Sequence, residues 1–216
     1  GAFDALAAGA TATTTVAVTV RDAAGNTDTA NLTVTVTGLN DAPSLTGTAT
    51  LPAVAEDTAD PAGASVSSLF GGLFADPDTG ASLSGIAITG TAATAAEGSW
   101  QVQIGGTGWI DLPTVSDTDA LLLDTTSQLR FVPAADYNGG PGGLTVRAVD
   151  DTYAGGFSTA PGGILADVRQ DVTGAGSGGT TAFSASDTAL TTSITAVNDA
   201  PAITAPATAS VAEDGT

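Results

Sequence analysis

The sequence of 216 residues contains 23 acidic residues and only four basic ones, which gives a formal net charge of −19. Nucleic-acid binding is excluded, because it requires a basic surface that neutralises phosphate. Histidine, lysine and cysteine are absent, which excludes disulfides, zinc sites built on Cys or His, and catalysis by a His or Lys base or nucleophile.

The first structural signal along the chain is a pair of strands. Residues 13–20 and 30–37 alternate in period two and are rich in Val and Thr, which suit a half-buried pleated surface. Gly25 and Asn26 lie between them and favour a tight connection. These residues predict a β-hairpin.

An internal repeat follows the predicted hairpin. The motif N-D-A-P at residues 40–43 recurs at 198–201, and A-E-D at 55–57 recurs at 212–214. Such a repeat indicates a slice of a tandem array. We therefore expect three parts: the C-terminal part of a preceding repeat at 1–40, one complete repeat at 41–198, and the first strand of a following repeat at 199–216.

The complete repeat is predicted to consist mainly of short β-strands separated by Gly-, Asn- and Asp-rich turns. Strands are expected at residues 48–54, 84–90, 99–104, 128–132, 143–149 and 190–197. Short helical turns fit 3–8, 66–73 and 117–123, and the Gly-rich segment 154–182 is expected to form a long insertion or loop. This pattern is typical of an antiparallel β-sandwich. No segment approaches the roughly 18 apolar residues of a spanning helix, so membrane insertion is not expected.

Three segments of the complete repeat resemble a known family: RFVPAADYNG at 130–139, LTVRAVDD at 144–151 and ITAVNDAP at 194–201. They are similar to bacterial cadherin-like tandem repeats, and residues 3–43 resemble the second half of a VCBS-type repeat. The resemblance implies an all-β, Ig/cadherin-like sandwich in a tandem array. It also implies a module of a large secreted RTX-type adhesin, commonly stiffened by Ca²⁺ near domain junctions.

The acidic residues are consistent with Ca²⁺, which prefers carboxylate and carbonyl oxygens presented from loops. By similarity to cadherins, an upper site is expected from Asn40, Asp41, Asp76, Asp78 and Asp150. A lower site is expected from Glu56, Asp57, Asp136, Asn198 and Asp199. The chain departs from the vertebrate cadherin pattern, because the linker lacks the full D-x-N-D-N motif and no D-R-E triplet is present.

Other interpretations of these acidic residues stay open. Asp and Asn also initiate turns through hydrogen bonds from side chain to backbone. The net charge is consistent with repulsion that bound divalent ions relieve. It is equally consistent with adaptation to a saline habitat, where screening is enough.

Trp100 and Trp109 flank a Gly-rich turn and would stack on sugar rings if both were exposed. Large aromatic side chains more often lie in the core of a sandwich, and we expect at least one of the two there. Carboxylates alone do not define a glycosidase, so no catalytic residue and no enzymatic activity are expected.

The expected function is that of a structural extender of a bacterial cell-surface adhesin, in cell adhesion or biofilm formation. The expected location is extracellular. Expected partners are neighbouring repeats of the same chain, further copies of it, and a glycan or a host or surface protein. The alternative is an adhesion module with its own glycan or protein ligand, bound at the Trp100–Trp109 turn or the 154–182 segment.

Overall fold

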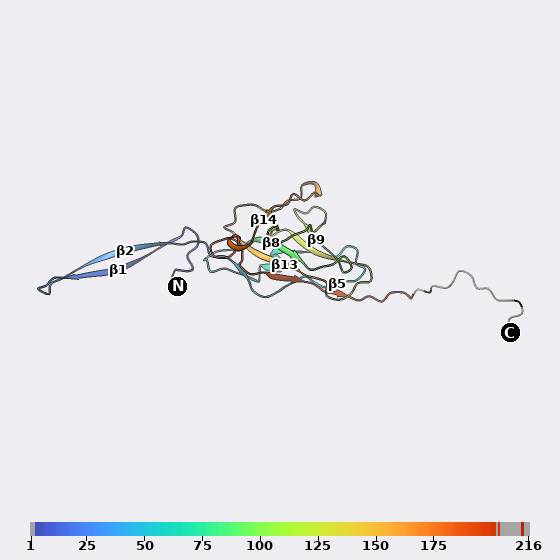
Figure 1. Cartoon of the computed structure of the whole chain (residues 1–216), viewed down its shortest axis with the longest axis horizontal. Helices are drawn as coiled ribbons and strands as arrows, with labels where there is room; N and C mark the ends of the chain where they lie inside the picture. The colour runs from blue at the N-terminus through green and yellow to red at the C-terminus, as the bar shows by residue number, and fades with distance from the viewer. Residues whose placement is uncertain (1–2, 202, 204–212, 214–216) are drawn as a thin grey trace.

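The computed structural model describes residues 3–201, 203 and 213, and these form an all-β protein with one short α-helix. A long hairpin projects from one end of a central body, and β5 lies near the opposite end (Figure 1). The all-β class and the antiparallel pairing expected from the sequence are confirmed. An Ig/cadherin-like sandwich remains the prediction for how the sheets are layered.

The hairpin consists of β1 (Thr11–Arg21) and β2 (Thr27–Thr37), which pair antiparallel over their whole length. Asp22 closes the turn, because its carboxylate accepts hydrogen bonds from the backbone N–H and the side-chain amide of Asn26, both at 2.8 Å. Gly25 supplies the positive φ of 91° in this turn. The predicted hairpin is confirmed, with strands longer than expected.

Two larger sheets form the central body. The antiparallel four-stranded sheet has the order β10 (Ile110–Asp111), β9 (Gly98–Gln103), β12 (Gln128–Pro133) and β6 (Ala64–Ser65). The six-stranded sheet has the order β14 (Arg169–Gln170), β11 (Ala120–Asp124), β8 (Leu83–Thr91), β13 (Leu144–Asp150), β15 (Thr188–Thr191) and β4 (Ala49–Thr50). β15 and β4 run parallel.

The remaining elements are short. Two further strand pairs are β3 (Ser44–Leu45) with β7 (Phe74–Ala75), and β16 (Ile194–Thr195) with β5 (Val54–Ala55). The helices are α1 (Val66–Phe70) and the 3₁₀ turns η1 (Pro161–Gly163) and η2 (Gly174–Gly176).

The main hydrophobic core joins buried side chains from both larger sheets. Ile88 of β8 belongs to the same cluster as Trp100 of β9 and Phe131 of β12. The rings of Trp100 and Phe131 pack edge to face with centroids 5.3 Å apart. Trp100 is 3% exposed and donates its indole N–H to the Gly142 carbonyl at 2.9 Å. It is therefore a core residue and offers no sugar-stacking surface.

The second face of the six-stranded sheet is covered by the segment that follows β13. Leu121 and Leu123 of β11 belong to the main core, whereas Leu122 lies in a second cluster with Val172 and Phe183. The segment expected to form a loop at 154–182 therefore contributes Val172 to a packed layer.

Three expected elements differ from the structure. The strand expected at 190–197 is divided into β15 and β16, which belong to different sheets. Residues 120–124 form β11 and not the helical turn expected at 117–123, because a strand buried on both faces shows no apolar–polar alternation. The strand expected at 48–54 is divided into β4 and β5, with Pro52 between them. Proline has no N–H to give to a ladder, which accounts for this interruption.

Candidate metal sites

The first candidate site lies where the chain passes from the hairpin into the central body. Asn40 donates its side-chain N–H groups to Asp150 Oδ2 and to the backbone oxygens of Asp41 and Thr181, each at 3.1 Å. The backbone N–H of Asp41 donates to Asp78 Oδ2 at 2.9 Å. The linker is therefore fastened to the end of β13 and to the loop between β7 and β8.

Asp76 and Asp78 both belong to the loop between β7 and β8. The backbone N–H of Asp78 donates to Asp76 Oδ1 at 2.8 Å. The other two oxygens, Asp76 Oδ2 and Asp78 Oδ1, are buried without a hydrogen-bond partner, and no other buried side-chain polar atom of the described residues lacks one. Because a buried carboxylate oxygen without a partner is costly, this pair fits a bound cation or a bound proton.

Asp150 adds a third carboxylate to this upper cluster. It is 0% exposed, and Asp78 is 6% exposed. Asp150 Oδ1 accepts hydrogen bonds from the Thr152 backbone N–H at 2.8 Å and from its hydroxyl at 2.6 Å. Burial raises the pKa of Asp76, and the charges of Asp150, Asp78 and Asp151 raise it further, against the opposing hydrogen bond from Asp78 N–H. A cation would relieve this repulsion.

No arginine ion pair neutralises the upper cluster within the described part of the chain. The three arginines of the central body pair elsewhere: Arg130 with Asp60, Arg147 with Asp117 and Asp187, and Arg169 with Asp119 and Asp167. A surface pocket lined by Ala8, Asn40, Asp78 and Asp151 opens beside the cluster. The cluster thus combines uncompensated negative charge with access from solvent.

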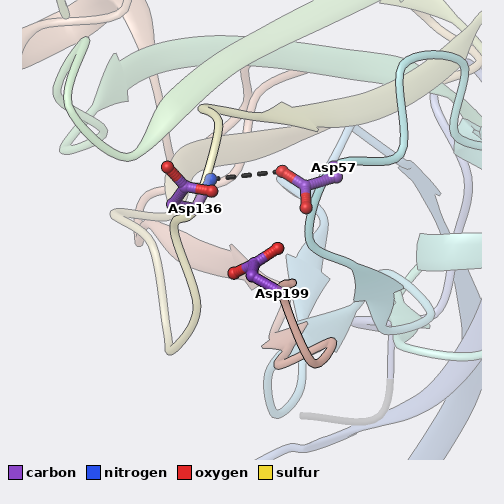
Figure 2. A group of neighbouring side chains, drawn as sticks. All are labelled: Asp57, Asp136 and Asp199. Carbon is purple, nitrogen blue, oxygen red and sulfur yellow. Dashed lines mark hydrogen bonds between the residues drawn. The ribbon is translucent and has the colours of Figure 1, made fainter. Parts of the chain in front are cut away.

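The second candidate site lies at the opposite end of the central body. Asp57 follows β5, Asp136 lies in the turn after β12, and Asp199 lies in the linker after β16. Figure 2 shows the three side chains approaching one another from these separate segments. One carboxylate oxygen of each lies within 4.8 Å of the others, and the Asp136 backbone N–H donates to Asp57 Oδ1 at 3.2 Å. These three exposed carboxylates could hold a metal ion.

Backbone and charge both distinguish this lower cluster. Asp57 and Asp136 have φ of 63° and 59°, and they are the non-glycine residues of the described chain in the left-handed region. Desolvation raises the pKa of Asp199, and the charges of Asp136, Asp57 and Glu56 add to that shift. Burial and the neighbouring negative charges therefore disfavour the ionised form of Asp199.

Glu56 and Asn198, also expected as lower-site ligands, have other partners. Glu56 accepts a hydrogen bond from the Val197 backbone N–H on Oε1 and one from Asn138 on Oε2 at 2.9 Å. The Val197 bond, followed by the Asn138 bond, lowers the pKa of Glu56. Asn198 donates to the Asp199 carbonyl at 3.1 Å, which repeats the bond between Asn40 and Asp41. Glu56 therefore ties the outgoing linker to the body.

The structure brings the five residues expected at the upper site to one junction. Of the five expected at the lower site, it brings three into one cluster. Sequence reasoning missed Asp151, although the adjacent pair Asp150–Asp151 was a visible signal. It also missed Thr152 and Asn138, which hold Asp150 and Glu56 through hydrogen bonds. No motif in the sequence marks either of these polar side chains.

A scan against protein-family models and searches of curated proteins and of solved structures found no match to this chain. Within the described residues, no helix has both the length and the hydropathy needed to cross a membrane.

Proposed function

We propose that this chain is an extender module of a large bacterial cell-surface adhesin, and that Ca²⁺ at its interdomain junctions makes it rigid. The observation that carries the proposal is the pair of buried, unpartnered oxygens on Asp76 and Asp78. They lie beside the fully buried Asp150, at the point where the linker enters the body. The resemblance to cadherin-like and VCBS-type repeats supports the same interpretation.

The donor set of the upper cluster suits a hard cation. Asp76, Asp78 and Asp150 supply carboxylates. Asn40 and Asp41 are the linker residues that are hydrogen-bonded to Asp150 and Asp78. Ca²⁺ takes six to eight oxygen ligands of this kind in flexible geometry, whereas Mg²⁺ demands near-octahedral geometry and keeps more of its water. Residues of the linker and of the body would hold the same ion. The ion would therefore act as a cross-link that limits the movement of the hairpin relative to the body.

A thermal melt by circular dichroism, first in EDTA and then with Ca²⁺, tests the proposal. Ca²⁺ at 100 times its dissociation constant is expected to raise the free energy of unfolding by about 2.7 kcal/mol. Mg²⁺ and NaCl at matched ionic strength are expected to raise it less. The backbone N–H of Asp41, bonded to Asp78, should exchange with solvent more slowly when Ca²⁺ is added.

The double variant Asp76→Asn/Asp78→Asn keeps side-chain shape and removes two charges, and it should abolish the Ca²⁺ response. Asp28→Asn/Asp111→Asn is the matched control, because it removes two exposed carboxylates that lie on β2 and β10, outside the cluster. The control should keep the full response. An equal rise with NaCl and with Ca²⁺, or an equal loss in both double variants, would show that the carboxylates form only a solvated acidic surface.

A further inference from the structure

The chain contains the same strand pair twice, and this repeat locates the two points where tension along an array would reach the central body. In the hairpin, Val16 is opposite Leu32, and in the central body Leu144 is opposite Leu190. Adding 128 to the residue numbers of β1 and 158 to those of β2 converts one register into the other throughout the three pairs of β13 and β15. The offset of 158 is also that of the repeated N-D-A-P motif. Tension would therefore enter the body at the first copy of the motif and leave it at the second.

Strands near these two points run parallel and lie side by side. β4 and β5 follow the first copy of the motif, and β15 and β16 precede the second. β4 pairs with β15, and β5 pairs with β16, both in parallel. The hairpin and the exit of the chain beyond β16 lie at opposite ends of the central body (Figure 1). Tension would therefore pull β4 and β5 toward one end and β15 and β16 toward the other, along the strands.

Two sets of hydrogen bonds hold together this parallel pair, which comprises residues 49–56 and 190–197. Backbone N–H groups of the first segment donate to carbonyls of the second at 2.8 to 3.0 Å: Leu51 to Thr191, Val54 to Ser193 and Glu56 to Thr195. Threonine hydroxyls of the second segment donate to carbonyls of the first at 3.3 to 3.4 Å: Thr191 to Ala49, Thr192 to Pro52 and Thr195 to Val54. Hydrogen bonds therefore cross the parallel pair in both directions.

The parallel pair is shielded from water by the main core. Four of its apolar side chains are at most 4% exposed and belong to that core: Ala49, Leu51, Leu190 and Ile194. At the exit end, Glu56 is 4% exposed and accepts the backbone N–H of Val197 on Oε1. Water therefore has little access to replace these hydrogen bonds as they break.

The direction of loading decides how many of these hydrogen bonds must break at once. When two parallel strands are pulled in opposite directions along their length, all the bonds between them bear the load together, because the strands can only slide past one another. When two strands are pulled apart from one end, the bonds break one after another. Each neutral hydrogen bond contributes little by itself, and forced unfolding is governed by the unfolding rate. The parallel pair therefore resists tension best when it is loaded along the strands.

We propose that the parallel pair is the force-bearing element of this module, which carries tension from one neighbouring repeat to the next in shear. The proposal rests on the extender function proposed above, because an extender transmits tension between its neighbours. It goes beyond that function by assigning the resistance of the body to hydrogen bonds between residues 49–56 and 190–197. A cation at the upper cluster would limit movement at the junction, whereas the parallel pair keeps the body itself from being pulled open.

Single-molecule force spectroscopy on the full chain in EDTA tests the proposal by changing only the direction of loading. The chain has no cysteine, so pairs of cysteines introduced at exposed positions define where force is applied. Leu39→Cys/Ala200→Cys loads the body from entry to exit. Leu39→Cys/Ser186→Cys pulls the starts of both strand segments apart, because Ser186 precedes β15 and lines the same surface pocket as Asp41 and Ser44. The unfolding force should be several-fold higher in the first variant, although urea unfolding should give both the same stability.

Two threonine variants make the test specific to the parallel pair. Thr192 is 7% exposed and donates its hydroxyl to the Pro52 carbonyl at 3.3 Å. Thr89 of β8 is 6% exposed and donates its hydroxyl to the Thr145 carbonyl of β13, also at 3.3 Å. Under constant force from entry to exit, Thr192→Val should shorten the lifetime of the folded state about fivefold, the equivalent of one neutral hydrogen bond. Thr89→Val should leave that lifetime unchanged, although both variants should lose similar stability in urea.

The use of EDTA separates this proposal from that of a cation at the junction. A melt that does not respond to Ca²⁺ would contradict the cation site and leave the difference between the two directions of loading in place. Equal unfolding forces in the two directions, or equal lifetimes of the two threonine variants, would overturn the proposed role of the parallel pair, whatever the response to Ca²⁺.

Discussion

The hairpin β1–β2 and the pair β13–β15 are one strand pair in two surroundings. Both align apolar side chains in the same register, and both follow the same alternation of Val, Leu and Thr. In the body this face meets the opposite sheet and is buried, whereas in the hairpin it faces solvent. Local pattern is enough to align two strands, but the stabilisation from burial depends on what covers them.

Truncation of the two corresponding leucines, Leu190 and Leu32, measures how much burial of this face contributes to the free energy of unfolding. Leu190→Ala should lower the free energy of unfolding by about 3 kcal/mol, because it leaves a cavity in the main core. Leu32→Ala, at the same register position, should change it by less than about 0.5 kcal/mol. Urea unfolding of both variants at low protein concentration measures the two values. Similar losses would mean that the hairpin face is covered in solution.

A polar pair provides the next comparison. Arg147 Nε donates to Asp187 at 2.8 Å, and its guanidinium also donates to Ser177 at 2.7 Å. The same register position of the hairpin holds Thr19 and Thr29, whose hydroxyls are 2.9 Å apart. Arg147→Ala should cost about 2 kcal/mol, because it removes a packed stem and leaves acceptors unpaired. Thr19→Ala should cost less than about 0.5 kcal/mol. The control Arg147→Lys keeps the charge but lacks the planar, forked donors of the guanidinium. Its loss of unfolding free energy should fall between those of the other two variants in the same urea experiment.

The same contrast explains how much could be predicted from the sequence. The hairpin was predictable because alternation and the Gly25–Asn26 turn are local signals. β11 was not, since Leu121, Leu122 and Leu123 are divided between two cores that the sequence does not display. The upper cluster was expected through family resemblance and through its acidic pairs. The partners of Glu56 were not, because Val197 and Asn138 reach it only through the tertiary fold.

A smaller effect is expected at the upper cluster in EDTA. The pKa of Asp76 is raised in the folded protein, mainly by burial, so its ionisation destabilises the fold as the pH rises from its ordinary value of 3.8 through the folded value. At neutral pH, Asp76→Asn should therefore stabilise the metal-free protein by about 1 kcal/mol, by removing a buried unpaired charge. Its advantage should vanish below pH 3.8. Urea unfolding across pH measures this, and an advantage that grows as the pH falls would contradict the assigned cause.

The smallest effect is expected at Asp22, in the hairpin turn. There the pKa is lowered, so ionisation stabilises the folded state, whereas at Asp76 it destabilises it. Hydrogen bonds from the Asn26 side chain and backbone lower the pKa of Asp22 below its ordinary value of 3.8. Its ionised form therefore supports the turn above that value, and the support is lost as the pH falls through the lower folded pKa. Because the group is exposed, the change should appear in hairpin amide exchange and in the NMR titration of the Asp22 carboxyl, with no measurable shift of the global melt.

Asn26→Ala should move the pKa of Asp22 back toward its ordinary value while leaving that of Asp76 unchanged. If Asp22 and Asp76 moved together, the hairpin turn and the buried cluster would be electrostatically coupled, and the two ends of β1 and β2 could not be treated as separate environments.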